Sequence, residues 1–257
     1  MAANTMPVRR DLRFSLKVER AADWHADGAA VTHFFNAPSL MFPIGERFFM
    51  DSVRDYRDQI DYPGLKQQVL GFIGQTAMHT REHVEYNEAL QVMGLPARGF
   101  ERRFEKAFAL MKCLTPKSMR LAMTVALEHY TAIFGAELIE SWSDLDCAEE
   151  SYKQLWLWHA LEETEHKAVS FDVWIAVMEP GVKRYLMRIA AFLEMTISFW
   201  LATFLIHVSL IRADHLADHR VRDMWRLVRR LYGPRQGLFP RMVRPWFAFF
   251  RPGFHPW

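Results

Sequence analysis

Long segments of helical periodicity, separated by short breaks that often contain Pro or Gly, constrain the fold of this chain most strongly. Alternating strand patterns bounded by turn residues are scarce, and Gly and Pro number only 12 each among the 257 residues. The predicted helices are 44–60, 65–93, 99–113, 117–142, 147–178, 182–212 and 214–231. Long helices joined by short loops predict an all-α protein, and we expect an antiparallel four-helix bundle with additional C-terminal helices.

We expect one domain built from three consecutive parts. Residues 1–40 are predicted to form an N-terminal lead-in that is irregular apart from one short helix near 24–35. Residues 41–180 are predicted to form the helical bundle. Residues 181–257 are predicted to form hydrophobic, basic helices and an aromatic tail, which pack either on the bundle or on a membrane.

Composition excludes several classes of protein. Hydrophobic residues make up 51% of the chain and charged residues 24%, so the chain is not disordered. Two cysteines, Cys113 and Cys147, provide neither a disulfide framework nor a four-cysteine zinc site. The opening segment MAANTMPVRRDLRF lacks the apolar core of a signal peptide. We therefore expect a cytoplasmic protein, with the inner face of the membrane as the alternative location.

Two glutamates stand inside strongly apolar helical segments. The helical neighbours of Glu46 are Phe42, Phe49, Met50 and Val53. Glu128 is the only acidic residue in the segment LAMTVALEHYTAIFGA, and the small residues Thr131 and Gly135 leave room on its face. Burying an unpaired carboxylate costs several kcal/mol. Each glutamate is therefore expected either to pair with an Arg or His, or to bind a metal ion.

The segment WLWHALEETEHKAVSFD carries an E-x-x-H pair on an apolar helix. Glu163 and His166 project from the same face, with His159 close to them, so one metal ion can bind the carboxylate and the imidazole together. Such pairs are typical of carboxylate-bridged di-iron bundles. His159 is expected either as a further ligand or, more in keeping with its position, as a residue that hydrogen-bonds a ligating carboxylate.

The two halves of the predicted bundle share one layout. In the second half, Glu128 precedes the E-x-x-H pair by 35 residues, and in the first half Glu46 precedes position 76 by 30 residues. His79 follows that position by three residues, as a repeat predicts, but Thr76 stands where the repeat predicts a glutamate. Such a repeat is expected of a bundle that supplies one Glu from each of two helices and E-x-x-H from each of the others.

The sequence also resembles a known family. The blocks that carry the resemblance are FPIGERFF, FIGQTAMHTREHVEYNE, LEHYTA, WHALEETEHKAVSFDVW and FRPGFHPW. They look like the bacterial proteins called predicted metal-dependent hydrolases, which are similar to ferritin-like dimetal carboxylate proteins. The resemblance implies metal ligation by Glu46, His79, Glu128, Glu163 and His166. It also implies a glutamate after Gln75, where this chain has Thr76.

Thr76 leaves three arrangements open. His83 or Glu82 takes the missing position and two metal ions are kept, or water takes it and the second site is weaker, or a single ion remains. We expect one or two divalent ions, with iron favoured and manganese or zinc as alternatives. The favoured function is the oxidation or oxygenation of a hydrophobic small molecule. The alternatives are hydrolysis with metal-activated water and a non-catalytic metal-binding or membrane-associated protein.

The C-terminal part differs from the rest in charge and hydropathy. Residues 181–257 contain 13 Lys and Arg against 4 Asp and Glu, and 195–211 contain no charged residue apart from a protonatable histidine. The segment 195–211 is expected to be a buried core helix, an interfacial helix or a membrane span. The expected partners are a hydrophobic substrate, the membrane surface as a peripheral contact, and further copies of the chain. No nucleic-acid motif is present, so we expect no nucleic-acid partner.

Overall fold

The computed structural model describes residues 6–140, 145–215, 217, 220–234 and 237–257, and within these ranges the chain contains helices and no strand. The all-α prediction is therefore confirmed. The α-helices are α1 (Ala29–Ser39), α2 (Phe42–Arg54), α3 (Pro63–Val92), α4 (Ala97–Leu114), α5 (Lys117–Glu140), α6 (Glu150–His166), α7 (Val169–Val177), α8 (Val182–Ala213), α9 (Arg220–Tyr232) and α10 (Leu238–Ala248).

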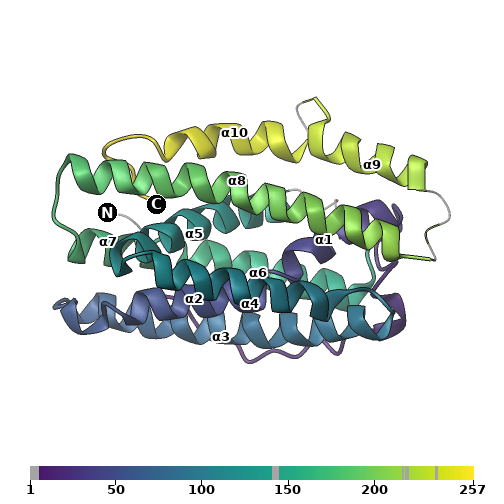
Figure 1. Ribbon diagram of the computed structural model, residues 1–257, viewed down its shortest axis with the longest axis horizontal. Helices are drawn as coiled ribbons and strands as arrows, with labels where there is room; N and C mark the ends of the chain where they lie inside the picture. Colours follow the sequence, from purple (N-terminus) through teal and green to yellow (C-terminus); the bar gives the residue numbers. More distant parts are fainter. Residues whose placement is uncertain (1–5, 141–144, 216, 218–219, 235–236) are drawn as a thin grey trace.

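Four helices pack around a common interior in a closed ring. Helix α2 packs on α3 and α5, and α6 packs on the same two helices from the other side. Helices α8 and α10 cover α5, while α9 packs on α1. In Figure 1, α8, α9 and α10 lie together on the side of the molecule opposite α3. The ferritin-like relationship stays a prediction.

Several predicted element boundaries differ from the structure. The single helix expected over 147–178 is divided into α6 and α7 at Lys167 and Ala168. Helix α9 begins at Arg220 rather than 214, and the C-terminal tail contains α10, which was not predicted. The short helix expected near 24–35 is found at Ala29–Ser39 and is entirely buried. The predicted end of the helix 117–142 lies outside the described residues.

The first residues of α2, α3 and α6 explain why these helices begin where they do. Pro43 and Pro63 stand in the first turns of α2 and α3, where the missing N–H is not needed. The side chain of Glu149 accepts hydrogen bonds from the backbone N–H groups of Ser151 and Tyr152 and so caps α6. This cap fixes the start of the helix that carries the E-x-x-H pair.

Helix α8 is long and apolar enough to cross a membrane, but polar contacts attach it to the rest of the protein. Its most apolar window has a mean hydropathy of 1.9, and only 22% of that window is buried. Polar contacts hold its inner side: the Arg188 guanidinium donates to the backbone carbonyl of Arg251 at 2.9 Å, and Tyr185 donates to that of Phe250 at 2.7 Å. At the other end, His207 Nε2 donates to the carbonyl of Ala30 on α1 at 2.9 Å.

The burial of His207 predicts that stability depends on pH. Burial lowers the pKa of this imidazole below its ordinary value of 6.5. In the unfolded chain the group takes up a proton as the pH falls through about 6.5, whereas the folded chain does so only at lower pH. Wild-type protein is therefore expected to lose stability relative to His207→Gln as the pH falls through about 6.5. Urea unfolding of both proteins checks this, and parallel pH profiles would contradict it.

Candidate metal centre

Two adjoining groups of buried side chains offer metal ligands in the centre of the helical ring. The first group contains Glu46 from α2, His79 from α3, and His159 and Glu163 from α6. The second contains Glu128 from α5, with Glu163 and His166 from α6. Within each group, one ligand atom per residue lies within 4.8 Å of the others. All five ligands predicted from the sequence are thus brought together, and His159 joins them.

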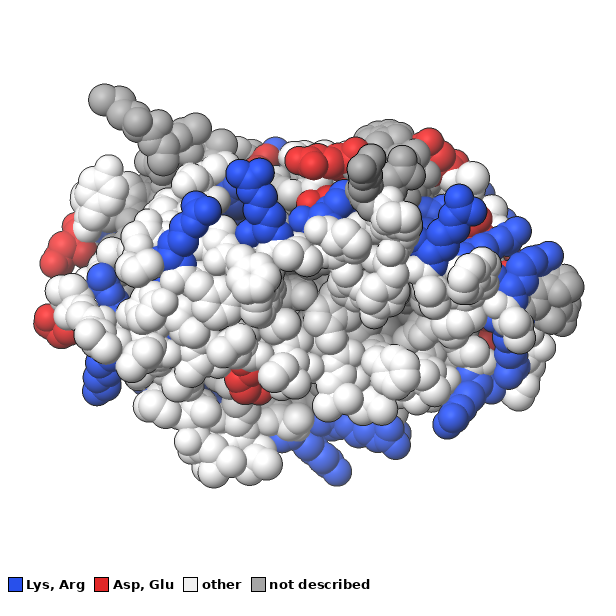
Figure 2. All heavy atoms as spheres, turned by 90° about the horizontal axis from the view of Figure 1, so that it is seen from above, with Lys and Arg blue, Asp and Glu red and all other residues white. Residues whose placement is uncertain are grey.

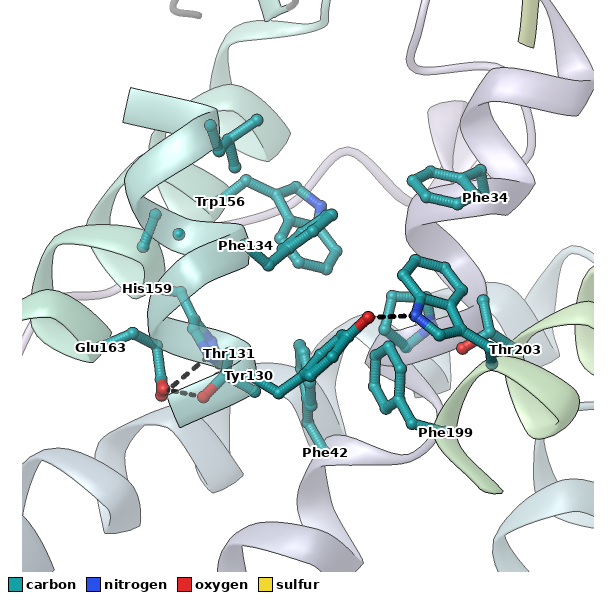
Figure 3. A pocket seen from close by; sticks show the side chains of 15 residues that line it. Phe34, Phe42, Tyr130, Thr131, Phe134, Trp156, His159, Glu163, Phe199 and Thr203 are labelled. Atoms are coloured by element: carbon teal, nitrogen blue, oxygen red, sulfur yellow. Dashed lines mark hydrogen bonds and ion pairs between the residues drawn. The ribbon is translucent and has the colours of Figure 1, made fainter. Parts of the chain in front are cut away.

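One carboxylate oxygen of Glu163 belongs to both groups. Its Oε1 lies 3.5 Å from His79 Nδ1, and 3.3 Å from both His159 Nε2 and His166 Nε2. The other oxygen, Oε2, accepts a hydrogen bond from the hydroxyl of Thr131 on α5. Figure 3 shows Thr131 and His159 reaching Glu163 from different helices. Thr131 therefore holds the carboxylate so that Oε1 faces the three imidazoles.

A chain of hydrogen bonds fixes the tautomer of His159. The Asn87 amide N–H₂ group faces the Ser39 carbonyl at 3.2 Å and Glu101 at 3.3 Å, so its oxygen accepts from Ser39 Oγ at 3.0 Å. Ser39 Oγ then accepts from His83 Nδ1 at 2.9 Å, which leaves His83 Nε2 to accept from His159 Nδ1 at 2.8 Å. The remaining nitrogen, His159 Nε2, has no proton in this neutral chain and points toward Glu163.

The tautomer of His166 is fixed in a similar way. The Gln75 amide donates to Glu165 at 2.8 Å and to the Val8 carbonyl at 3.2 Å, so its oxygen faces His166 Nδ1 at 3.1 Å. His166 Nδ1 therefore carries the proton, and Nε2 presents its lone pair to Glu128 Oε2 and Glu163 Oε1, each 3.3 Å away. Orientation of a ligating imidazole by a hydrogen bond on its outer nitrogen is typical of metal centres.

His79 completes the set through Glu162. His79 Nε2 lies 3.2 Å from Glu162 Oε2, while His79 Nδ1 faces Glu46 at 3.6 Å. The other oxygen of Glu162 accepts from Arg10 at 3.1 Å and from the Trp158 indole at 2.8 Å. Arg10 thus neutralises a carboxylate that lies behind the histidine. Glu162 itself is fully buried and pairs with Arg10 instead of facing solvent.

The pKa shifts in the centre follow from burial and from these contacts. Burial raises the pKa of Glu128 well above its ordinary value, and the nearby Glu163 adds to the effect. Burial acts in the same direction on Glu163, but its histidine neighbours, His166 first, outweigh it when they are protonated and then hold that pKa well below the usual range. Burial lowers the pKa of both His83 and His159, and mutual repulsion within the histidine cluster adds to it. The neutral form required of a ligating imidazole is therefore favoured at His159.

The pKa of His79 shifts in the opposite direction from those of His83 and His159. Burial lowers its pKa, but the carboxylates of Glu162, Glu163 and Glu46 outweigh this effect and raise the pKa well above 6.5. A cation bound at Nδ1 would have to displace that proton, so metal binding is expected to weaken as the pH falls.

The residues present fit one or two metal ions. Several buried ligand atoms have no hydrogen-bond partner: Glu46 Oε2, His79 Nδ1, Glu128 Oε1, Glu128 Oε2, His159 Nε2 and His166 Nε2. Leaving so many buried polar atoms unsatisfied is costly. Metal ions would satisfy them together, because a mixed carboxylate and imidazole set suits divalent transition metals.

Thr76, Glu82 and His83, the other residues weighed as additional ligands, lie outside both groups. Thr76 is buried, but its hydroxyl donates to the Phe72 carbonyl at 2.7 Å. Glu82 accepts from Arg81 at 2.7 Å and from the Phe14 backbone N–H at 3.3 Å. His83 hydrogen-bonds Nδ1 of His159, the nitrogen that faces away from Glu163, and it belongs to neither group. Of the positions weighed from the sequence, His159 is the one that adds a ligand atom to the group around Glu46.

A largely apolar pocket leads to the centre. Its volume is about 260 Å³, and it is bounded by α2, α4, α5 and α8. Glu46 and Thr131 lie on its wall, among aromatic and aliphatic side chains such as Phe49, Phe108 and Met195. A second, narrower cavity of about 20 Å³ reaches His159 and Glu163, and Figure 3 shows the aromatic rings around it. Phe42 and Thr131 line both cavities.

Sequence reasoning missed the residues that position the ligands. Gln75, Ser39 and Arg10 are ordinary polar residues by sequence, and no spacing rule connects them with the motif. Arg10 and Ser39 belong to the segment 1–40, which was expected to be a lead-in. Gln75 precedes the position where the repeat departs, and this adjacency is the one signal that pointed to it.

Comparison with known proteins agrees with this geometry. A family model described as a predicted metal-dependent hydrolase matches residues 8–257. No match is found among curated proteins or among solved structures. The family description supports the hydrolase alternative better than oxidation, which was the first expectation, and it does not identify the metal. The resemblance noted from the sequence is confirmed, and the chain belongs to the predicted metal-dependent hydrolase family.

Proposed function

We propose that this protein is a metal-dependent hydrolase that binds two divalent ions between α2, α3, α5 and α6. Glu46, His79 and His159 would hold one ion, Glu128 and His166 the other, and Glu163 would contact both. The observation that carries the proposal is the position of Glu163 Oε1 among three imidazole nitrogens at 3.3–3.5 Å. Two divalent ions held there would supply a more acidic bound water and polarisation of a substrate carbonyl.

The protein's own residues prepare the centre for this chemistry. The outer nitrogens of His159 and His166 are held by His83 and Gln75, so the inner nitrogens need no rearrangement to bind a cation. Three carboxylates balance most of the charge of two divalent ions. The negative charge of Glu162, which lies behind them, is matched by Arg10. Burial of the whole cluster excludes bulk water and strengthens these interactions.

The pocket indicates the substrate class. Apolar surface makes up most of its lining, and Glu46 lies on its wall. A hydrophobic acyl group bound there would place a carbonyl near Glu46, while the aromatic walls would exclude bulk solvent. We therefore propose an ester or amide with an apolar acyl chain as the substrate.

A single set of assays tests this function. Protein purified without chelator is loaded anaerobically with zinc, manganese or ferrous iron, and its metal content is measured by inductively coupled plasma mass spectrometry. Turnover of p-nitrophenyl esters from acetate to dodecanoate is then followed, with oxygen consumption recorded in parallel. We expect about two ions per chain and ester turnover that rises with acyl length. Oxygen consumption coupled to substrate loss, without ester turnover, would support oxidation instead.

A substitution in the pocket, compared with a matched control on the same helix, tests whether the pocket binds the acyl chain. Ala202 lines the pocket, whereas Ala190 stands on the exposed side of the same helix. Ala202→Phe is expected to lower kcat/KM for the dodecanoate ester by roughly tenfold or more while changing the acetate ester little. Ala190→Phe is expected to leave both values unchanged. Equal effects of both substitutions would contradict the assignment of the pocket.

A further inference from the structure

The outward side of α8 is apolar over most of its length. Six large apolar side chains on it are at least 40% exposed: Leu186, Leu193, Ile197, Leu201, Phe204 and Leu205. Between Arg188 and Arg212 the sequence contains one charged residue, Glu194. Its side chain is exposed and, viewed down the helix axis, lies between Leu201 and Leu205 of this stripe. A core helix would bury such residues, and an isolated surface helix would carry charges there.

Helix α9 presents a second apolar stripe. Val221, Trp225, Val228 and Tyr232 recur at helical spacing, and all four are exposed. Arg222 and Arg229 are also exposed on the same helix. Aromatic and aliphatic residues flanked by arginines are typical of helices that lie in a membrane interface.

We call the exposed stripes of α8 and α9 together the α8–α9 face. Figure 2 views the molecule from the side on which α8, α9 and α10 lie, and it shows a broad, mostly uncharged area that is interrupted by an acidic group, with Lys and Arg mostly around its edge. Residues 181–257 carry 13 basic against 4 acidic side chains. The surface thus combines apolar contact area with a positive border.

The opposite side of α8 is fixed to the domain. Phe192, Ile206 and Leu210 are buried in the core, and the contacts of Arg188 and His207 with backbone carbonyls hold the helix at both ends. A helix held along one side in this way lies parallel to the surface of the molecule. The geometry therefore favours contact within the plane of a membrane interface over a transmembrane span.

We propose that the α8–α9 face docks on a lipid bilayer that contains anionic lipids. A positive border attracts an anionic leaflet, whereas the same face of a second copy would bring two arginine-rich borders together. The mouth of the apolar pocket supports this choice. Its exposed residues Glu194 and Ser198 adjoin Leu193 and Ile197 of the stripe, so docking places the pocket entrance at the leaflet.

Vesicle flotation tests the proposal without reference to catalysis. The full chain is mixed with vesicles of phosphatidylcholine alone, or with equal parts of phosphatidylcholine and phosphatidylglycerol. We expect binding to the anionic vesicles that weakens with added salt. Leu201→Lys is expected to reduce the partition coefficient by roughly tenfold or more, because the variant lacks the leucine side chain that docking would bury in the bilayer. Leu70→Lys on α3 is the matched control, since both leucines are 56% exposed.

Each outcome distinguishes between explanations. Selective loss of flotation in Leu201→Lys, with unchanged metal content in both variants, supports docking whether or not the protein proves to be a hydrolase. Absence of flotation, or equal loss in both variants, overturns the proposal. A dimer in solution that Leu201→Lys dissociates, detected by light scattering without vesicles, assigns the face to a second copy instead. Resistance of vesicle-bound protein to alkaline carbonate extraction would indicate a transmembrane span and also overturn it.

Discussion

Glu163→Gln is expected to remove metal from both groups of ligands, so that the protein retains less than one ion per chain. The reason is geometric, because Oε1 of this one carboxylate faces His79, His159 and His166 at 3.3–3.5 Å. Substitutions of residues that merely orient ligands cost ten- to a hundredfold in metal affinity, so loss of a shared ligand should cost more than about a hundredfold. Mass spectrometry of the purified protein measures this directly.

Glu82→Gln is the control for that experiment. Glu82 is also a buried carboxylate, at 2% exposed, but it pairs with Arg81 outside both ligand groups. Its substitution is expected to leave the metal content at the wild-type value. Circular dichroism should show that both variants stay helical. Full metal content in Glu163→Gln would contradict the assignment of the metal centre. Loss of metal in Glu82→Gln would indicate that Glu82 is a ligand.

Gly135→Val is expected to destabilise the fold by roughly 3 kcal/mol. Gly135 lies where α5 and α6 approach closely, and a Cβ atom there would stand 2.9 Å from the carbonyl oxygen and 3.2 Å from the Cα of Ala160. Both neighbours are backbone atoms of a packed helix, so they cannot move aside as a flexible side chain would. The added side chain must therefore separate the helices that carry Glu128 and Glu163. Urea unfolding measures the change in the free energy of unfolding.

Gly99→Val provides the comparison. Gly99 lies in α4, and a Cβ atom there meets nothing within 4 Å. Because valine has a better helix propensity than glycine, the free energy of unfolding is expected to change by less than about 0.5 kcal/mol. Similar losses in both variants would show that the close approach at Gly135 does not control stability. Reduced metal affinity in Gly135→Val, compared with Gly99→Val, would link helix spacing to the metal centre.

Several features of the protein were determined by local sequence. The period of the apolar residues predicted helices, and the isolated acids at Glu46 and Glu128 predicted which faces turn inward. The E-x-x-H spacing placed Glu163 and His166 on one face, because residues three apart on a helix are neighbours. The structure brings these residues together with His79. Their role as metal ligands stays a prediction that the experiments above test.

Other features depended on tertiary structure. No proline or glycine marks the division between α6 and α7, so periodicity alone joined the two helices. The position of His159 in the centre depends on His83 and Ser39, which come from other helices and from residues far apart in the sequence. Periodicity reports which way a side chain faces on its own helix, but it does not report which polar atoms of other helices meet it. The sequence thus determined the helices and their inward faces, and only the packing of α1, α3 and α6 decided which imidazole nitrogens face the metal centre.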